Sequence, residues 1–258
     1  MSAISNTLTI AKKDFRGYFT SPVAYVIMAI FSFIMGWMFF SIFKAFIDNA
    51  MNFERFQYGK GPNLTDHMIR PLYGNLNVVL LFIVPFITMR LFAEERKNNT
   101  LELLVTAPIR WIEIVFGKYL SAFGFVLVLL ALTLPYPFAL YAATTPDWAV
   151  IGMCYLGTVC MIGVYVAVGM WCSSLTENQI IAGGLTFGII LFFWIIKWAS
   201  LTAGPVWGDI LSYLSIIDHF EDFSRGVFNT KDLVFYVSTI GLWLFLTYKA
   251  LESYSWRS

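Results

Sequence analysis

The stretch MRLFAEERKNNTLELLVTAP, Met89 to Pro108, is the longest clearly polar and charged passage of a chain that is otherwise apolar. It lies between two long apolar segments and holds four consecutive charges, Glu94 to Lys97. Asn99-Thr-Leu-Glu102 resembles a capping box, which predicts a short helix that begins at Thr100. Pro108 ends this helix, because the residue before a proline avoids helical geometry.

A helix of about seven residues is too short to be stable without a partner. Leu101, Leu104 and Val105 lie on one face of it, so this face is expected to be buried. The helix therefore packs either beneath its own membrane domain or in a groove of a partner protein. The four charges that precede it are expected to carry the chain out of the membrane.

The composition indicates a membrane protein. Of the 258 residues, 59% are hydrophobic and 13% are charged, whereas soluble domains carry about 25% charge. Crossing a bilayer takes about 20 apolar residues, and six stretches are long enough. The sequence thus predicts an all-α integral membrane protein, with residues 1–258 as one domain and spans at about 22–43, 74–92, 114–141, 149–172, 179–201 and 233–250. Pro135 and Pro137 predict a kink near the outer end of the third span.

Lysine and arginine set the expected orientation. The segments on the N-terminal side of the predicted membrane hold more of these residues than the segments on the other side, and such an excess is typical of the cytoplasmic side. Both termini are therefore expected in the cytoplasm. The net charge of +1 gives no reason to expect a nucleic-acid partner.

The residues before the first span predict an amphipathic helix on the inner membrane face. Its cations, Lys12, Lys13 and Arg16, are expected near lipid phosphates. The alternative is a frayed cytoplasmic tail. The apolar stripe consists of Ile4, Leu8, Ala11, Phe15 and Phe19.

The segment 202–232, on the outer side, contains a second amphipathic pattern. About 15 residues are too few to span a bilayer, so the segment is expected to lie at the outer surface or to dip into the membrane under the cover of other helices. Its apolar stripe is Ile210, Tyr213, Leu214, Ile217, Phe220 and Phe223, and its polar face is Asp218, Glu221, Asp222 and Arg225.

Motifs for catalysis and for nucleotide binding are missing from the sequence. It has no G-x-x-x-x-G-K-[ST], no H-E-x-x-H and no G-x-S-x-G. We therefore expect no catalytic, cofactor-binding or metal-binding residues, and an intramembrane enzyme is disfavoured. His67 and His219 lie far apart in the sequence and are expected at the surface or the membrane interface.

The remaining polar residues of the spans are few. Cys154, Cys160 and Cys172 are expected to be buried as small hydrophobic residues rather than to form a disulfide or a metal site. Lys197 is the one charge well inside a span, and it is expected to extend to the headgroups. Without an intramembrane acidic or histidine relay, energy for any uphill transport must come from elsewhere.

The passage TMRLFAEERKNNTLELLVTAPIRWIEIVFGKYLSAF, Thr88 to Phe123, resembles the signature of type-2 ABC transporter permeases. The sequence is more closely similar to the gliding-motility and copper/nitrous-oxide-associated branch. YFTSPVAYV (Tyr18–Val26) and SIIDHFEDFSRGVFNTKDLVFYVS (Ser215–Ser238) support this similarity. Asn99 stands where a glycine is typical, and asparagine tolerates the left-handed turn expected there.

This resemblance implies a role for each of three segments. The loop between spans two and three would be a cytoplasmic coupling helix that docks in a separate ATPase, and the first helix would be the family's interface helix. Residues 205–225 would be outer re-entrant or surface helices. The residues carried over are Glu94, Glu95, Arg96, Thr100, Leu101, Glu102, Leu104 and Val105 for coupling, Lys12, Lys13, Phe15 and Arg16 for the interface helix, and Ile217, His219, Phe220, Phe223 and Arg225 for the outer helix.

The resemblance also implies the partners and the activity. The expected partners are a cytoplasmic ABC ATPase that binds ATP and magnesium, a second permease copy or paralogue, further envelope or periplasmic proteins, and lipid of the bacterial inner membrane. The chain itself would bind no cofactor. We expect a permease subunit that exports an apolar or amphipathic substrate. The alternative is a membrane anchor that turns the ATPase cycle into mechanical work on an envelope machine, without a transported solute.

Overall fold

The computed structural model describes residues 3–56, 63–98, 100, 110–143 and 146–255, and within these residues the chain is helical without β-strands. Six helical segments are long and apolar enough to cross a membrane, with a mean hydropathy of 1.4 to 2.3. The predicted all-α fold with six spans is therefore confirmed. The six segments are Pro22–Asn52, Thr65–Lys97, Trp111–Tyr141, Trp148–Leu175, Gln179–Thr202 and Thr230–Ser253.

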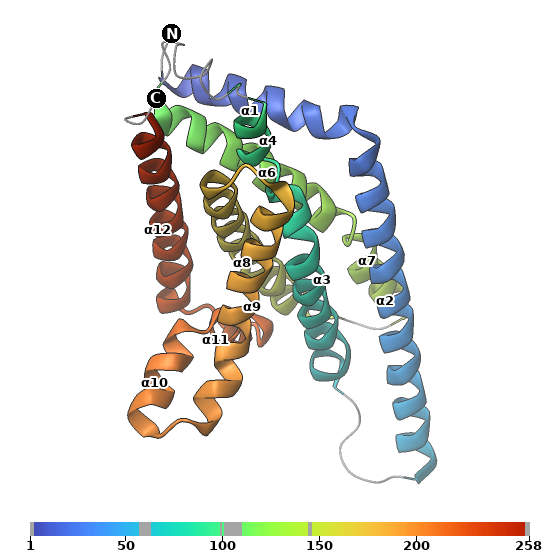
Figure 1. Ribbon diagram of the computed structural model, residues 1–258. Helices are drawn as coiled ribbons and strands as arrows, with labels where there is room; N and C mark the ends of the chain where they lie inside the picture. The colour runs from blue at the N-terminus through green and yellow to red at the C-terminus, as the bar shows by residue number, and fades with distance from the viewer. Residues whose placement is uncertain (1–2, 57–62, 99, 101–109, 144–145, 256–258) are drawn as a thin grey trace.

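The helices are arranged as a bundle with one helix laid across an end (Figure 1). α1, α4 and the C-terminal turns of α12 lie at this end, called the terminal end below, and α10 lies at the opposite end. The elements are α1 (Ala3–Thr20), α2 (Pro22–Phe56), the π-helix η1 (Thr65–Ile69), α3 (Arg70–Thr88), α4 (Ala93–Lys97), α6 (Trp111–Ala131), α7 (Pro135–Ala143), α8 (Trp148–Leu175), α9 (Gln179–Thr202), α10 (Pro205–Leu214), α11 (Ile216–Ser224) and α12 (Thr230–Ser255).

The core of the bundle is formed around α3 and α8. About two thirds of the most apolar stretch of each is buried, whereas α2, α9 and α12 leave most of theirs uncovered. Glycines allow the close contacts of α8. A Cβ built on Gly169 would lie 2.1 Å from Oγ1 of Thr88 in α3, and one on Gly163 would lie 2.7 Å from Ile240 in α12. Only a glycine fits at these two contacts without displacing its neighbours.

The third predicted span is broken rather than kinked. α6 ends at Ala131, a turn occupies residues 132–134, and α7 begins at Pro135. Thr133 Oγ1 donates to the Leu130 carbonyl at 2.6 Å, which satisfies a backbone group freed at the helix end. The proline favours the start of a new helix, because its missing N–H is not needed there.

The N-terminal segment folds as a helix that packs on α6, but its packed face is displaced from the predicted stripe. Tyr18 stacks on Phe125 of α6 with a centroid distance of 4.8 Å, and Ile10 lies against Gly117. In contrast, Ile4 and Leu8 are 73% and 57% exposed. The packed face includes Asp14, whose ion pair with α6 is described below, and this pair accounts for the displacement.

The outer segment forms two helices instead of one continuous stripe. Ser215 separates α10 from α11, and its hydroxyl accepts a hydrogen bond from the Asp218 N–H at 3.3 Å, as expected of an N-cap. Phe220 and Phe223 are buried in α11. The predicted members from α10, namely Ile210, Tyr213 and Leu214, are exposed. The expectation of a single stripe was therefore wrong for its first half.

Candidate functional site

The corner between α3 and α4 is held by the end of α8. The buried hydroxyl of Ser173 accepts hydrogen bonds from the backbone N–H groups of Phe92 at 3.0 Å and Ala93 at 3.1 Å. It donates to the Met89 carbonyl at 3.0 Å. One serine thus satisfies three backbone groups of the corner, and buried groups of this kind require a partner. The position of α4 is therefore set by α8.

A second link joins α4 to the same end of α8. Arg96 Nη1 donates to the Ser174 carbonyl at 2.6 Å. This carbonyl belongs to the last turn of α8, where the helix dipole favours a positive charge. α4 itself has Glu94 and Glu95 in its first turn and Arg96 and Lys97 in its last, which is the order that the dipole favours. The four charges thus form a short helix of their own, which the sequence had not indicated.

Lys118 of α6 joins three elements at the terminal end. Its side chain is 7% exposed, and Nζ lies 2.7 Å from Glu95 Oε1 of α4 and 3.3 Å from Asp14 Oδ2 of α1. The ammonium also lies 5.3 Å from the centroid of the Phe92 ring, within the range of a cation–π contact. A buried lysine requires such partners. We call Lys118, Glu95 and Asp14 the junction triad.

The junction triad was not predicted from the sequence. The place of Lys118 inside an apolar helix was a signal that it needs an acidic partner. A further hydrogen bond joins α1 to α6: Asn6 Nδ2 donates to Glu113 Oε2 at 3.0 Å. Glu113 is buried in the first turn of α6. α1 is thus fixed by two polar contacts in addition to its apolar face.

The predicted coupling residues are only partly within the described chain. Glu94, Glu95 and Arg96 belong to α4, and Thr100 follows with its N–H 3.0 Å from the Glu95 carbonyl. Leu101, Glu102, Leu104 and Val105 lie outside the described residues, and so does the predicted helix beyond its first residue, Thr100. Of the interface-helix residues, Phe15 packs near Gly124 of α6, whereas Lys12, Lys13 and Arg16 are exposed.

The predicted outer-helix residues are brought together on α11 and the turn after it. His219 is buried, with Nδ1 2.6 Å from Asp232 Oδ1 and Nε2 2.9 Å from the Tyr213 carbonyl. His219 is therefore not a surface residue, because Asp232 of α12 offers it a buried acidic partner, and its place at the membrane interface stays a prediction. Ile217 is half-buried, and Arg225 pairs with Glu221 at 2.6 Å.

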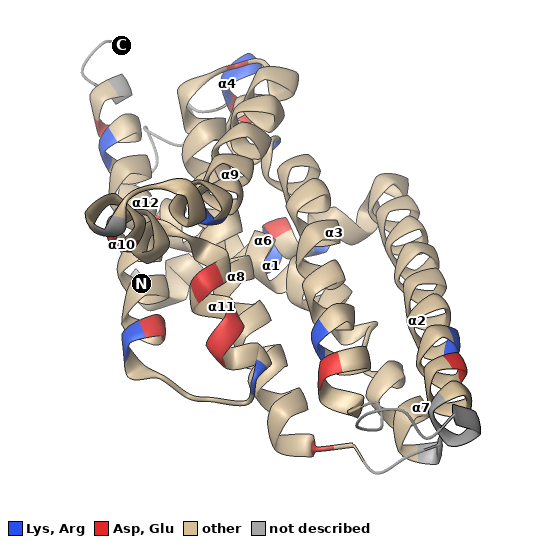
Figure 2. Ribbon diagram, turned by 90° about the horizontal axis from the view of Figure 1, so that it is seen from below, with Lys and Arg blue, Asp and Glu red and all other residues tan. Residues whose placement is uncertain are grey.

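Lys197 of α9 pairs with two acidic residues of α11. Its Nζ lies 2.8 Å from Glu221 Oε2 and 3.1 Å from Asp218 Oδ1. Arg70 at the start of α3 reaches Glu221 at 3.6 Å. The acidic residues of α11 and the charges of α4 stand out against the mostly uncharged spans in Figure 2. The sequence had not indicated these two acidic partners of Lys197.

These features define a polytopic helical membrane protein whose charged loop between the second and third spans is anchored to the core at the terminal end. The chain belongs to the ABC-2 transporter family, because the family model "ABC-2 family transporter protein" matches residues 8–250. It is thus a multi-pass membrane permease subunit of an ABC transporter, a class that works with an ABC ATPase. The chain matches no curated protein.

Proposed function

We propose that this permease moves an apolar or amphipathic substrate across the bacterial inner membrane, with both termini in the cytoplasm. A separate ATPase, which binds ATP and magnesium, would drive it through the loop between α3 and α6. The observation that supports this proposal is the attachment of α4 to the rest of the bundle. Ser173, Ser174 and the junction triad connect this short helix to α8, α6 and α1. A force applied to the loop would therefore reach three elements together.

A second permease copy or paralogue would complete the assembly. The support is the surface that the single chain leaves uncovered, since α2 and α9 bury little of their apolar stretches. Gly184 and Gly188 of α9, spaced as GxxxG, have no neighbouring atom within 4 Å of a built Cβ among the described residues. Small residues on an open helix face favour close helix association in membranes.

The closer assignment, to the gliding-motility and copper/nitrous-oxide-associated branch, rests on the segments Tyr18–Val26 and Ser215–Ser238. It allows an alternative in which the chain anchors an ATP-driven envelope machine and transports no solute. Further envelope or periplasmic proteins would then be partners. Solute flux in proteoliposomes that contain the permease and its ATPase separates the two functions, because an anchor would sustain ATP hydrolysis without flux.

The coupling role is tested by replacing Leu101 and Leu104 with aspartate. Each leucine that is buried in an ATPase cleft would contribute about 1.5–3 kcal/mol, and the introduced charges would be costly to bury. The expected result is loss of the ATPase in a pull-down with an unchanged melting profile of the permease. Leu201→Asp, at an exposed site on the far end of α9, is the control and should retain the ATPase.

Two outcomes would contradict the coupling role. The first is a double variant that loses stability while the surviving protein still binds its ATPase, since the predicted helix would then pack inward. The second is reproducible ATP hydrolysis by the purified chain alone, after contaminating ATPases have been excluded. Energy would then not need to come from a partner.

A further inference from the structure

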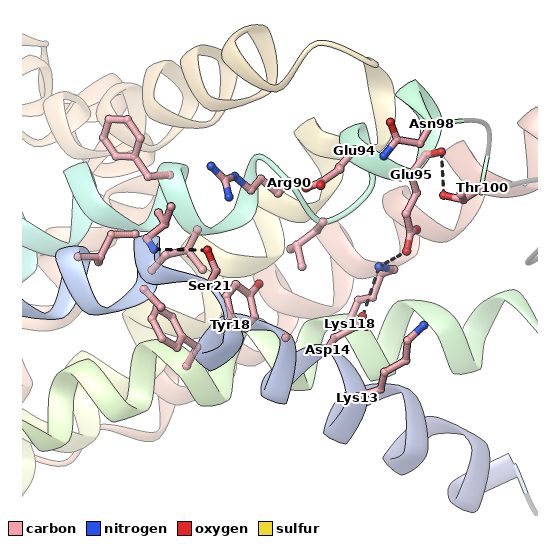
Figure 3. Close-up of a pocket in the computed structure, with 18 residues that line it drawn as sticks. Lys13, Asp14, Tyr18, Ser21, Arg90, Glu94, Glu95, Asn98, Thr100 and Lys118 are labelled. Carbon is pink, nitrogen blue, oxygen red and sulfur yellow. Dashed lines mark hydrogen bonds and ion pairs between the residues drawn. The ribbon is translucent and has the colours of Figure 1, made fainter.

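A cavity of about 530 Å³ opens at the terminal end between α1, the start of α2, the end of α3 and α4 (Figure 3). Its volume lies in the range of about 300–1,000 Å³ that is typical of sites for small ligands. Residues of α6 also contribute to its walls, so three parts of the chain that are distant in sequence meet there. A ligand in this cavity would therefore touch both the junction of α1 with α2 and the corner that leads to α4.

The walls of the cavity change from polar to apolar along its length. Ser21 stands at the junction of α1 with α2, and the next lining residues, Val23 and Ile27, lead down the apolar span. On the α3 side, Phe86 lies four residues before Arg90 and within the span. The arrangement matches a ligand with a polar head at the terminal end and a hydrocarbon part toward the bilayer.

Arg90 is the cation at the Ser21 end of the cavity. Two lysines also line the cavity: Lys118 is already paired with Asp14 and Glu95, and Lys13 extends away from the Ser21 end in Figure 3. Within the described part of the chain, Arg90 has no hydrogen-bond acceptor and no ion-pair partner. Figure 3 shows its guanidinium directed toward the Ser21 end of the cavity, away from the carboxylate of Glu94.

Two hydroxyl groups stand on the same side of the cavity as this guanidinium. The Ser21 hydroxyl accepts from the Val23 N–H at 3.4 Å, which leaves its proton free to donate. Burial raises the pKa of Tyr18, so its hydroxyl remains a donor at any physiological pH. These groups surround the first turn of α2, where the helix dipole favours an anion. Arginine, hydroxyl groups and a helix start form a donor set suited to phosphate.

We propose that this cavity binds one anionic phospholipid, with Arg90, Ser21 and Tyr18 around its phosphate and with Val23, Ile27 and Phe86 against the upper part of an acyl chain. Basic pockets between transmembrane helices recognise anionic headgroups in this way. The bound lipid joins the α1–α2 junction to the corner before α4. The proposal rests on the cavity alone and holds whether or not the loop docks an ATPase.

The test uses the full chain, purified in detergent and stripped of lipid. It is titrated with long-chain phosphatidylglycerol, with phosphatidylcholine of the same chains, and with glycerophosphoglycerol, which is the headgroup without chains. The melting temperature is followed at each concentration, because a ligand that binds the native state raises it. Phosphatidylglycerol should give a saturable increase, and the other two compounds should give little.

Two matched variants locate the effect. Arg90→Gln should raise the apparent Kd for phosphatidylglycerol about tenfold or more, as expected for the loss of a charge-assisted hydrogen bond. Arg16→Gln removes the same charge from an exposed site of α1 that does not line the cavity, and it should leave the Kd unchanged. Val23→Trp fills the apolar part and should weaken binding while the charges stay in place.

Several results would overturn the proposal. Equal weakening by Arg90→Gln and Arg16→Gln would mean that lipid binds the basic surface of α1 without a defined site. Equal stabilisation by glycerophosphoglycerol would identify a site for a soluble phosphate ester. Equal stabilisation by phosphatidylcholine would identify ordinary lipid contacts that do not depend on headgroup charge.

Discussion

Nζ of Lys118 lies 2.7 Å from Oε1 of Glu95, so that a lysine of the third span holds the charged loop between the second and third spans. The same ammonium pairs with Asp14 of the N-terminal helix. The loop and the first helix therefore share one cation. A change that moves either of them alters the electrostatic environment of the other.

Lys118→Met should destabilise the protein, because it leaves two acidic side chains without their cation. Removal of one partner from a buried pair costs about 3–5 kcal/mol, and the partial exposure of Asp14 and Glu95 reduces our expectation to about 2 kcal/mol. Thermal unfolding in detergent measures the effect. Lys249→Met, which removes an exposed lysine that pairs with its own helix neighbour Glu252, should change the melting temperature little.

A double-mutant cycle then isolates the Lys118–Glu95 contact. If the pair interacts as the structure indicates, Lys118→Met and Glu95→Gln together should cost less than the sum of the single changes, with a coupling of about 1 kcal/mol. Strict additivity would show that the contact contributes nothing to stability. In the complex with the ATPase, the same variants should lower ATP hydrolysis if the proposed coupling is correct.

Gly169→Ala should destabilise the bundle strongly, although it adds only one methyl group. The added methyl group would lie 2.1 Å from Oγ1 of Thr88, so either α3 or α8 must move. Overpacking of this kind costs about 1–3 kcal/mol. Gly152→Ala, also in α8, is the matched control, since a Cβ there meets nothing within 4 Å. A similar melting temperature for both variants would contradict the close α3–α8 contact.

The ion pairs of Glu221 predict a dependence on pH. The hydrogen bond from Lys197 lowers the pKa of Glu221 below its usual value, and burial opposes this effect only in part. A carboxyl group with a lowered pKa in the native state contributes stability above its unfolded pKa of about 4.3, and this contribution is lost as the pH falls through the lower native value. Glu221→Gln should therefore reduce the melting temperature at pH 7.

The difference between Glu221→Gln and the unmodified protein should shrink as the pH falls below about 4. Asp209→Asn on the neighbouring helix α10 serves as a control for general effects of acid, since Asp209 takes no part in the ion pairs between Lys197 and α11. A constant difference across the whole pH range would mean that the charge of Glu221 does not stabilise the fold.

Accessibility to an impermeant thiol reagent tests the proposed orientation. Cysteines that replace Lys12, Lys97 and Lys249 all lie at the terminal end and should stay unlabelled in intact cells. A cysteine at Asp209 in α10 should react. The unmodified protein, with Cys154 and Cys172 buried, gives the background. Labelling of Lys97→Cys from outside would show that the orientation is the opposite of the proposed one, and it would contradict the proposed ATPase contact.

The spans were predictable because an apolar stretch of sufficient length has few alternatives to a membrane helix. The start of the fifth span at Gln179 is a clear example, since the prediction and the structure agree. The end of the first was less predictable. α2 continues to Phe56, beyond the apolar residues, because a helix that has already formed extends at little further cost.

The candidate site was predictable only where it is local in the sequence. The charged loop at Glu94–Lys97 can be recognised from its composition. The partner of Glu95 cannot be recognised in this way, because Lys118 is 23 residues away and gains its role only when α6 and α4 are placed together. The cap that Ser173 provides for Phe92 spans 81 residues and leaves no local pattern.

The contact between α1 and α6 has a consequence for how the chain is made. Asp14 and its partner Lys118 are 104 residues apart, and translation proceeds at about 5–20 residues per second, so α1 waits roughly 5–20 s for the helix it packs on. During this interval Phe125 of α6, on which Tyr18 and Phe19 pack, does not yet exist, and the membrane surface is the nearest apolar environment. The first helix thus reaches the bilayer before its final contacts exist, and the third span must insert beneath a helix that is already adsorbed there.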